Sequence, residues 1–130
     1  MSEQVILALT TCPDEPSARQ ISAALVKEGL ATCVNRVAGL RSTYFWDGRL
    51  QDEAEVLLMI KTTAGRLGEL GARLESLHPY ELPELVAIPV VGGNEAYLEW
   101  VRQGVTNSVV GRASARQEAV GPKADPQESE

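Results

Sequence analysis

The stretch Tyr44-Phe45-Trp46-Asp47-Gly48 decides the fold of this chain. A two-residue hairpin turn of type I′ needs positive φ angles at both central residues, and an Asp-Gly pair adopts them readily. Residues 31–46 before the turn predict one long strand with a bulge at Gly39, and residues 49–61 after it predict its partner. The sequence therefore predicts a long β-hairpin that turns at Asp47-Gly48.

The residues before the hairpin predict a buried strand and then a helix. Residues 5–9 are all apolar, and the strand is expected to stop at Thr10-Thr11-Cys12-Pro13 because proline cannot continue it. Asp14 or Ser17 can cap the helix that follows, and Gly29 supplies its C-terminal stop. A strand and a helix thus lead into the hairpin.

The residues after the hairpin repeat this order. Thr62 or Thr63 can cap a second helix, whose leucines lie on one stripe and which ends at His78-Pro79. Residues 85–91 predict a fourth strand, and Pro89 restricts this strand to a sheet edge or a bulged position. The chain therefore contains two units in which a helix lies between strands.

A short third helix and a polar tail complete the chain. Gly92-Gly93-Asn94 is expected to open the helix, on which Trp100 is expected to serve in packing. Periodicity fades after Gly104, so we expect residues 1–104 to form one domain and residues 105–130 to be a disordered or weakly helical tail.

The order strand, helix, strand, strand, helix, strand predicts an α+β fold, the ferredoxin-like βαββαβ sandwich, with an additional C-terminal helix. Both main helices would cover one face of the sheet. Residues 5–9, 56–60 and 85–91 are nevertheless apolar on both faces, whereas a sheet with one solvated face alternates. We expect identical subunits to cover the second face and to pair with the hairpin edges, the alternative being that the tail folds over that face.

Composition limits which partners and which cellular compartment are expected for this chain. The chain has 130 residues, a net charge of -6 and a pI near 4.8, so it repels nucleic acid and anionic membrane surfaces. The N-terminal apolar run is too short for a signal peptide or a membrane span, which favours the cytoplasm. Two cysteines, Cys12 and Cys33, are too few for a disulfide framework and are expected to be free thiols.

Several segments, in this order and spacing, together resemble the CutA family of divalent-cation tolerance proteins. The resemblance covers roughly residues 4–104 and implies a homotrimer similar in architecture to the PII signalling proteins, a response to copper and other divalent cations, and no established enzymatic activity. The segments are Thr11-Cys12-Pro13-Asp14-Glu15, Leu30-Ala31-Thr32-Cys33-Val34-Asn35, Tyr44-Phe45-Trp46-Asp47-Gly48, Ile60-Lys61-Thr62-Thr63, His78-Pro79-Tyr80-Glu81-Leu82-Pro83-Glu84 and Tyr97-Leu98-Glu99-Trp100.

Cys12, His78 and Glu84 are the candidate metal ligands. The predicted topology brings them to one edge of the sheet, and a thiolate, an imidazole and a carboxylate together suit copper or zinc. No H-x-x-x-H or C-x-x-C spacing is present, however, and a lone histidine after a helix is also typical of a hydrogen-bonding or capping residue.

The resemblance bears on the same site. Copper ligation in some members of the family is associated with a strand cysteine and two adjacent histidines, whose counterparts here are Thr10, Leu77 and His78. Only His78 is retained, and Cys12 lies two positions beyond Thr10. We therefore expect at most weak copper or zinc binding near subunit boundaries, and no required cofactor.

Other residues are candidates for contacts with small ligands or subunits. Lys61, Tyr80 and Cys33 are the candidate ligand-binding residues, although Lys61 could equally remain solvated and Cys33 could be a small buried hydrophobe. Tyr44 and Trp46 are expected at a subunit interface, because aromatic residues on a projecting hairpin anchor protein contacts.

The sequence is also compared with two alternative functions, a metabolite sensor and an enzyme. A PII-like sensor would bind a small metabolite in the clefts between subunits. An enzyme is not expected, because His78 is the only assignable base and neither a phosphate-binding nor a dinucleotide-binding motif is present.

Overall fold

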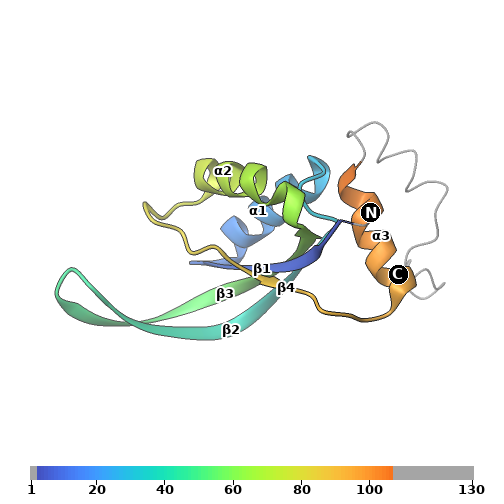
Figure 1. The fold of residues 1–130 in the computed structure, drawn as a ribbon. Coiled ribbons are helices and arrows are strands. Elements are labelled where there is room, and N and C mark those ends of the chain that lie inside the picture. Colours follow the sequence, from blue (N-terminus) through green and yellow to red (C-terminus); the bar gives the residue numbers. More distant parts are fainter. Residues whose placement is uncertain (1–2, 107–130) are drawn as a thin grey trace, which may run out of the picture.

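A computed structural model describes residues 3–106 and confirms the α+β ferredoxin-like fold. Four antiparallel strands form one sheet in the order β2-β3-β1-β4 (Figure 1). The elements in chain order are β1 (Val5–Cys12), α1 (Glu15–Lys27), β2 (Cys33–Trp46), β3 (Arg49–Thr63), the 3₁₀ turn η1 (Ala64–Arg66), α2 (Leu67–Leu77), β4 (Val86–Pro89) and α3 (Glu95–Thr106).

The main core lies between the sheet and the helices α1 and α2, which cover the same face (Figure 1). Ile21 and Leu25 of α1 and Leu74 of α2 pack onto Leu58 and Ile60 of the central strand β3. These five side chains are almost completely buried, as expected for residues at helical spacing and at alternate strand positions. The core thus packs α1, α2 and β3 together.

The opposite face of the sheet has no covering layer of helices within residues 3–106 (Figure 1). We call it the open face. Its apolar side chains come from all four strands, and three of them, on β2 and β4, are 43–48% exposed. The residues of the open face are Leu7, Leu9, Val37, Leu57, Met59, Val86 and Ile88. A second apolar face is therefore present. The tail, which is the alternative cover for this face, lies mostly outside the described residues.

The hairpin has the turn that its sequence predicts. Asp47 and Gly48 both have positive φ, 56° and 74°, as a type I′ turn requires. The register between β2 and β3 shifts between Val37 and Leu40, and Gly39 has a φ of 87° there. The expected bulge is therefore confirmed, and beyond it the two arms continue as a ribbon that projects from the core (Figure 1).

Two of the three predicted helix caps are present. Asp14 Oδ1 accepts a hydrogen bond of 2.9 Å from the backbone N–H of Ser17, and Asn94 Oδ1 accepts one of 2.9 Å from that of Ala96. The prediction for α2 was wrong, because β3 continues through Thr63 and η1 intervenes before the helix. Thr63 makes no side-chain capping bond, and the hydroxyl of Thr62 instead donates to the buried carbonyl of Leu30 over 2.7 Å.

The ends of several strands differ from their predicted positions. β1 does not stop before Thr10 but runs to Cys12, which pairs with Val56 of β3. β2 begins at Cys33 rather than at residue 31, and β4 is limited to Val86–Pro89. β4 pairs only with β1, so its predicted place at the sheet edge is confirmed.

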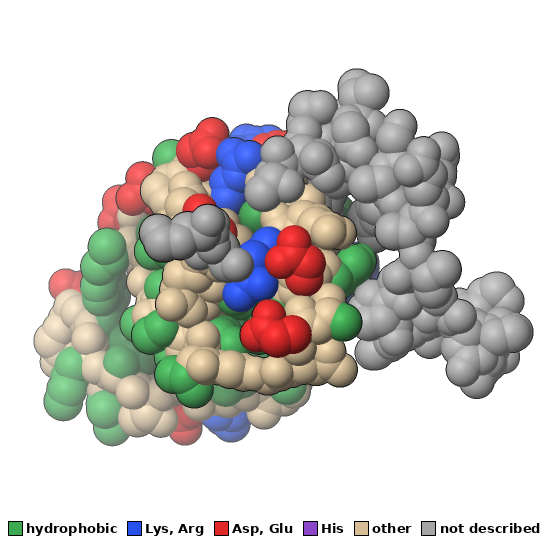
Figure 2. Space-filling view, turned by 45° about the vertical axis from the view of Figure 1, so that its right-hand side comes forward, with side chains coloured by type: hydrophobic (Ala, Val, Ile, Leu, Met, Phe, Trp, Pro, Cys, Tyr) green, Lys and Arg blue, Asp and Glu red, His purple; other side chains and the backbone are tan. Residues whose placement is uncertain are grey.

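Helix α3 packs beside one end of the sheet, where Leu98 and Val101 form a second small core with Val5. The helix extends past Gly104, and Val105 is almost completely buried. Figure 2, which brings this side of the molecule forward, shows acidic and basic side chains in contact with one another. Within residues 3–106 no helix is long and apolar enough to cross a membrane.

Candidate functional site

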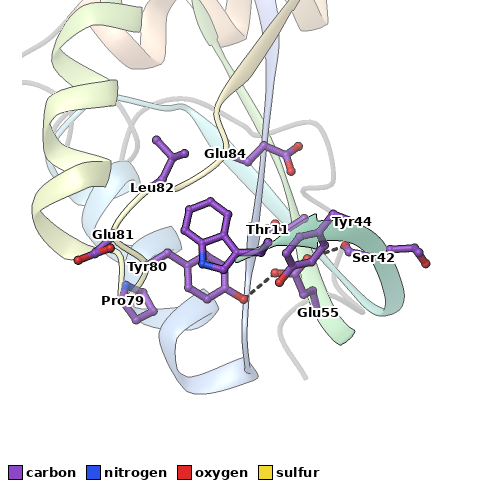
Figure 3. Close-up of a pocket in the computed structure, with 11 residues that line it drawn as sticks. Thr11, Ser42, Tyr44, Glu55, Pro79, Tyr80, Glu81, Leu82 and Glu84 are labelled. Carbon is purple, nitrogen blue, oxygen red and sulfur yellow. Dashed lines mark hydrogen bonds between the residues drawn. The ribbon is translucent and has the colours of Figure 1, made fainter. Parts of the chain in front are cut away.

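A pocket of about 590 Å³ lies between the hairpin and the segment 79–84, which joins α2 to β4 (Figure 3). Glu55 of β3, Tyr44 of β2 and Thr11 of β1 contribute side chains from the sheet. Tyr80 lies opposite them, and its hydroxyl points toward Glu55 (Figure 3). The pocket therefore draws on strands and a loop that are far apart in the sequence.

Glu55 is a buried carboxylate, only 6% exposed. The hydroxyl of Ser42 donates to its Oε1 over 2.5 Å, and that of Tyr80 donates to its Oε2 over 2.6 Å. Burying a carboxylate is costly unless its oxygens find hydrogen-bond donors, and here each oxygen has one. Glu55 is therefore held in one orientation at the wall of the pocket.

The two tyrosines of the pocket remain protonated donors. Burial, and then the hydrogen bond to the Glu55 carboxylate, raise the pKa of Tyr80 well above its usual range. Tyr44 donates to Glu53 Oε1 over 3.0 Å, and this hydrogen bond is the main cause of the raised pKa of Tyr44. Both hydroxyls consequently stay neutral at physiological pH and keep their carboxylate partners in place.

His78 joins the end of α2 to the end of β1. Its Nε2 lies 2.8 Å from the carbonyl oxygen of Thr11, and its Nδ1 lies 3.1 Å from the backbone nitrogen of Tyr80. A carbonyl only accepts and a backbone N–H only donates, so Nε2 carries the hydrogen and Nδ1 is the acceptor. Both ring nitrogens are therefore engaged within the chain, and the imidazole ring also contacts the Tyr80 ring at a centroid distance of 4.8 Å.

The other two candidate metal ligands lie in different surroundings. Cys12 is completely buried, and burial, with smaller contributions from Glu55 and Asp14, raises the pKa of its thiol to about 11. Glu84 is exposed and lines the pocket. Within residues 3–106, no three His, Cys, Asp or Glu side chains are grouped so that they could hold a metal ion.

The candidate ligand-binding residues are divided between two ends of the sheet. Tyr80 lies in the pocket, whereas Cys33 and Lys61 are directly opposite each other near the start of β2. Cys33 is partly exposed rather than fully buried, and Lys61 Nζ lies 5.7 Å from the centroid of the Tyr97 ring. The structure therefore separates Tyr80 from the other two residues.

Tyr44 and Trp46, the candidate interface residues, are both exposed and both line the pocket. Sequence reasoning missed Glu55 and Ser42. The available signal was the carboxylate of Glu55 at the border of the apolar run 56–60. The hairpin register places Glu55 opposite Leu40, and Ser42 is two residues further along the same strand. Its second partner, Tyr80, comes from a loop, and no local pattern predicts that contact.

Comparisons with known proteins agree with this architecture. The family model described as "CutA1 divalent ion tolerance protein" matches residues 6–104. The chain is 48% identical to a divalent-cation tolerance protein CutA of Thermus thermophilus, over 78% of this chain and 96% of that protein. It is 46% identical to the human Protein CutA, of which it spans only 58%. Among solved structures, CutA from Xylella fastidiosa has a TM-score of 0.77 and 44% identity, over 78% of this chain and 98% of that one.

Proposed function

Because the chain belongs to the CutA1 divalent ion tolerance family, we propose that it acts in the cellular response to copper and other divalent cations, as a cytoplasmic homotrimer without enzymatic activity. The observation that carries the assembly is the open face. Burial of its leucine, valine, isoleucine and methionine side chains lowers the free energy of the system. Contiguous exposed apolar patches of this kind mark interaction surfaces.

The strand edges support the same proposal. β2 and β4 are the two edge strands of the sheet, and each leaves one row of backbone groups without a partner strand in the described chain. The arms of the hairpin are 14 and 15 residues long, which extends the β2 edge well beyond the core. Tyr44 and Trp46 lie on this projecting part, where we propose that a neighbouring subunit contacts the surfaces of these side chains that lie outside the pocket.

Ile88 and Ala87 provide a matched test of the assembly. Both are exposed on β4, and successive strand residues point to opposite faces, so only Ile88 belongs to the open face. We expect light scattering to give three chain masses for the wild type and for Ala87→Glu, and a lower mass for Ile88→Glu. A monomeric wild type would refute the homotrimer.

Metal binding, as proposed here, is weak and lies near the subunit boundaries. Glu84 supplies an exposed carboxylate at the pocket, and a neighbouring subunit would have to complete the ligand set. His78 can join only if it gives up a hydrogen bond to Thr11 or Tyr80, and Cys12 only if its buried thiol loses a proton.

Calorimetric titration with copper and zinc tests these ligands. We expect weak binding by the wild type, reduced binding by Glu84→Gln and by His78→Ala, and no change in Glu75→Gln, which neutralises a carboxylate on α2. Identical titrations of the wild type and His78→Ala would remove His78 from the site. Identical titrations of the wild type and Glu84→Gln would remove Glu84.

A further inference from the structure

We propose that the pocket between the hairpin and the segment 79–84 binds an organic ammonium ion, a role that goes beyond metal tolerance and does not depend on it. Its volume of about 590 Å³ lies within the range of about 300–1,000 Å³ that is usual for small-molecule sites. Three features of the lining argue for this class of ligand: its charge, its aromatic rings and the fixed position of its buried carboxylate.

The charge of the lining favours a cation. Glu55, Glu81 and Glu84 line the pocket, and no lysine or arginine is among the lining residues. The buried Glu55 receives its two hydrogen bonds from neutral hydroxyls, and it forms no ion pair with any residue in the range 3–106. No basic side chain in that range therefore neutralises the Glu55 carboxylate, and a bound cation would interact with it favourably.

Aromatic rings favour an organic cation in particular. Tyr44, Trp46 and Tyr80 all line the pocket. The face of an aromatic ring attracts ammonium groups, and several rings around one site recognise quaternary ammonium ions. Pro79 and Leu82 add apolar surface that suits the hydrocarbon part of such a ligand.

The buried carboxylate and the two tyrosine rings are held in place before any ligand arrives. Ser42 and Tyr80 fix Glu55 (Figure 3). The hydrogen bond from Tyr44 to Glu53 fixes the second tyrosine. One subunit alone offers a bare divalent metal ion no complete ligand set here, because no three metal-ligating side chains are grouped within the described residues. A preorganised site of aromatic rings and one buried carboxylate is better matched to an organic ammonium group.

A matched pair of probes tests the proposal on the full chain, in its own oligomeric state and with a chelator present. One probe is hydroxypropyl-trimethylammonium, and the other is the alcohol in which carbon replaces its nitrogen. We expect tryptophan fluorescence to show saturable binding of the ammonium probe, with an affinity at least roughly tenfold above that of the neutral alcohol. Equal affinity for both probes, or no saturable binding of the ammonium probe, would overturn the proposal.

Variants locate the binding. Glu84→Gln neutralises an exposed carboxylate of the pocket, Glu55→Gln neutralises the buried one, and Glu75→Gln neutralises an exposed carboxylate on α2 outside the pocket. We expect both pocket variants to weaken binding of the ammonium probe several-fold and Glu75→Gln to leave it unchanged. If Glu55→Gln fails to fold, the affinity of Glu84→Gln for the ammonium probe still tests whether the probe binds in the pocket. Equal loss in Glu84→Gln and Glu75→Gln would place the binding elsewhere and overturn the assignment.

Discussion

The imidazole Nε2 of His78 donates a hydrogen bond of 2.8 Å to the carbonyl oxygen of Thr11, so the end of α2 is bonded to the end of β1. Nδ1 of the same ring accepts from the backbone N–H of Tyr80, which fixes the start of the loop that borders the pocket. His78 is therefore the residue through which a helix, a strand and the pocket loop are held together.

Replacing His78 by alanine should destabilise the chain. The carbonyl of Thr11 and the N–H of Tyr80 would both lose their partner, and we expect the free energy of unfolding to fall by about 1–3 kcal/mol. Urea unfolding measures this loss. The exposed neighbour variant Glu81→Ala should stay within about 0.5 kcal/mol of wild type, and equal stabilities of the two variants would contradict the structural role of His78.

Gly48 should resist substitution for conformational reasons. Its φ is 74°, and a side chain in this left-handed region costs about 1–2 kcal/mol although the space around the residue is free. We expect Gly48→Ala to lower thermal stability. Gly92→Ala, also in free space but without a positive φ, is the control and should be nearly neutral; an equally stable Gly48→Ala would show that the turn tolerates the residue.

Gly104 should resist substitution for steric reasons. A Cβ at this position of α3 would collide with the side chain of Thr32, whose hydroxyl is bonded to the carbonyl of Val101. We expect Gly104→Ala to cost about 1–3 kcal/mol through this overpacking. Gly68→Ala, in the open first turn of α2, should instead stabilise the chain by about 0.5–1 kcal/mol. Guanidinium unfolding of both variants measures the change in the free energy of unfolding, which should be a loss for Gly104→Ala and a gain for Gly68→Ala. A gain for Gly104→Ala would contradict the predicted collision.

The thiols should differ in reactivity. Cys12 is buried with its pKa raised to about 11, whereas Cys33 is partly exposed. We expect iodoacetamide at neutral pH to modify Cys33 and to spare Cys12, because the thiolate is the reacting form. Mass spectrometry of the digested protein identifies the modified site, and both thiols should react once the chain is unfolded. Earlier modification of Cys12 would contradict its burial.

The raised pKa of Cys12 also predicts a pH dependence. In the folded chain the Cys12 thiol stays neutral up to about pH 11, whereas in the unfolded chain it ionises from about pH 9.0. Its contribution to the free energy of unfolding is therefore complete below pH 9.0 and declines as the pH rises toward 11. Over that range the wild type should lose more stability than Cys12→Ser does. Parallel loss of stability in both proteins would show that Cys12 is not the group responsible.

The hairpin could be predicted from the sequence because its determinants are local. Asp47-Gly48 adopts the positive φ angles of its turn whatever surrounds it, and Gly39 accommodates the bulge in the same way. The end of β1 was not predictable on this basis. Cys12 belongs to the strand because it pairs with Val56, a contact between segments far apart in the chain.

The pocket could not be predicted from local sequence patterns. Glu55 lies beside an apolar run, yet its role depends on hydroxyls from Ser42 and Tyr80, which only the folded chain brings to its two oxygens. Tyr80 itself was a candidate, because the segment around it carries the resemblance to the family. The cap of α2 was mispredicted for a related reason: tertiary pairing extends β3 through Thr63, which leaves no free position there for a capping residue.

The two ends of the described range, residues 3 and 106, lie at one pole of the molecule (Figure 1). Arg102 of α3 donates to the carbonyl oxygen of Glu3 over 2.8 Å, and the Glu3 carboxylate accepts from the backbone N–H of Gly65. The hairpin tip projects from the opposite pole (Figure 1). A short linker could therefore join residue 106 to residue 3 in a circular permutant, with new ends opened elsewhere, and a label attached at this pole would leave the hairpin and the pocket unobstructed.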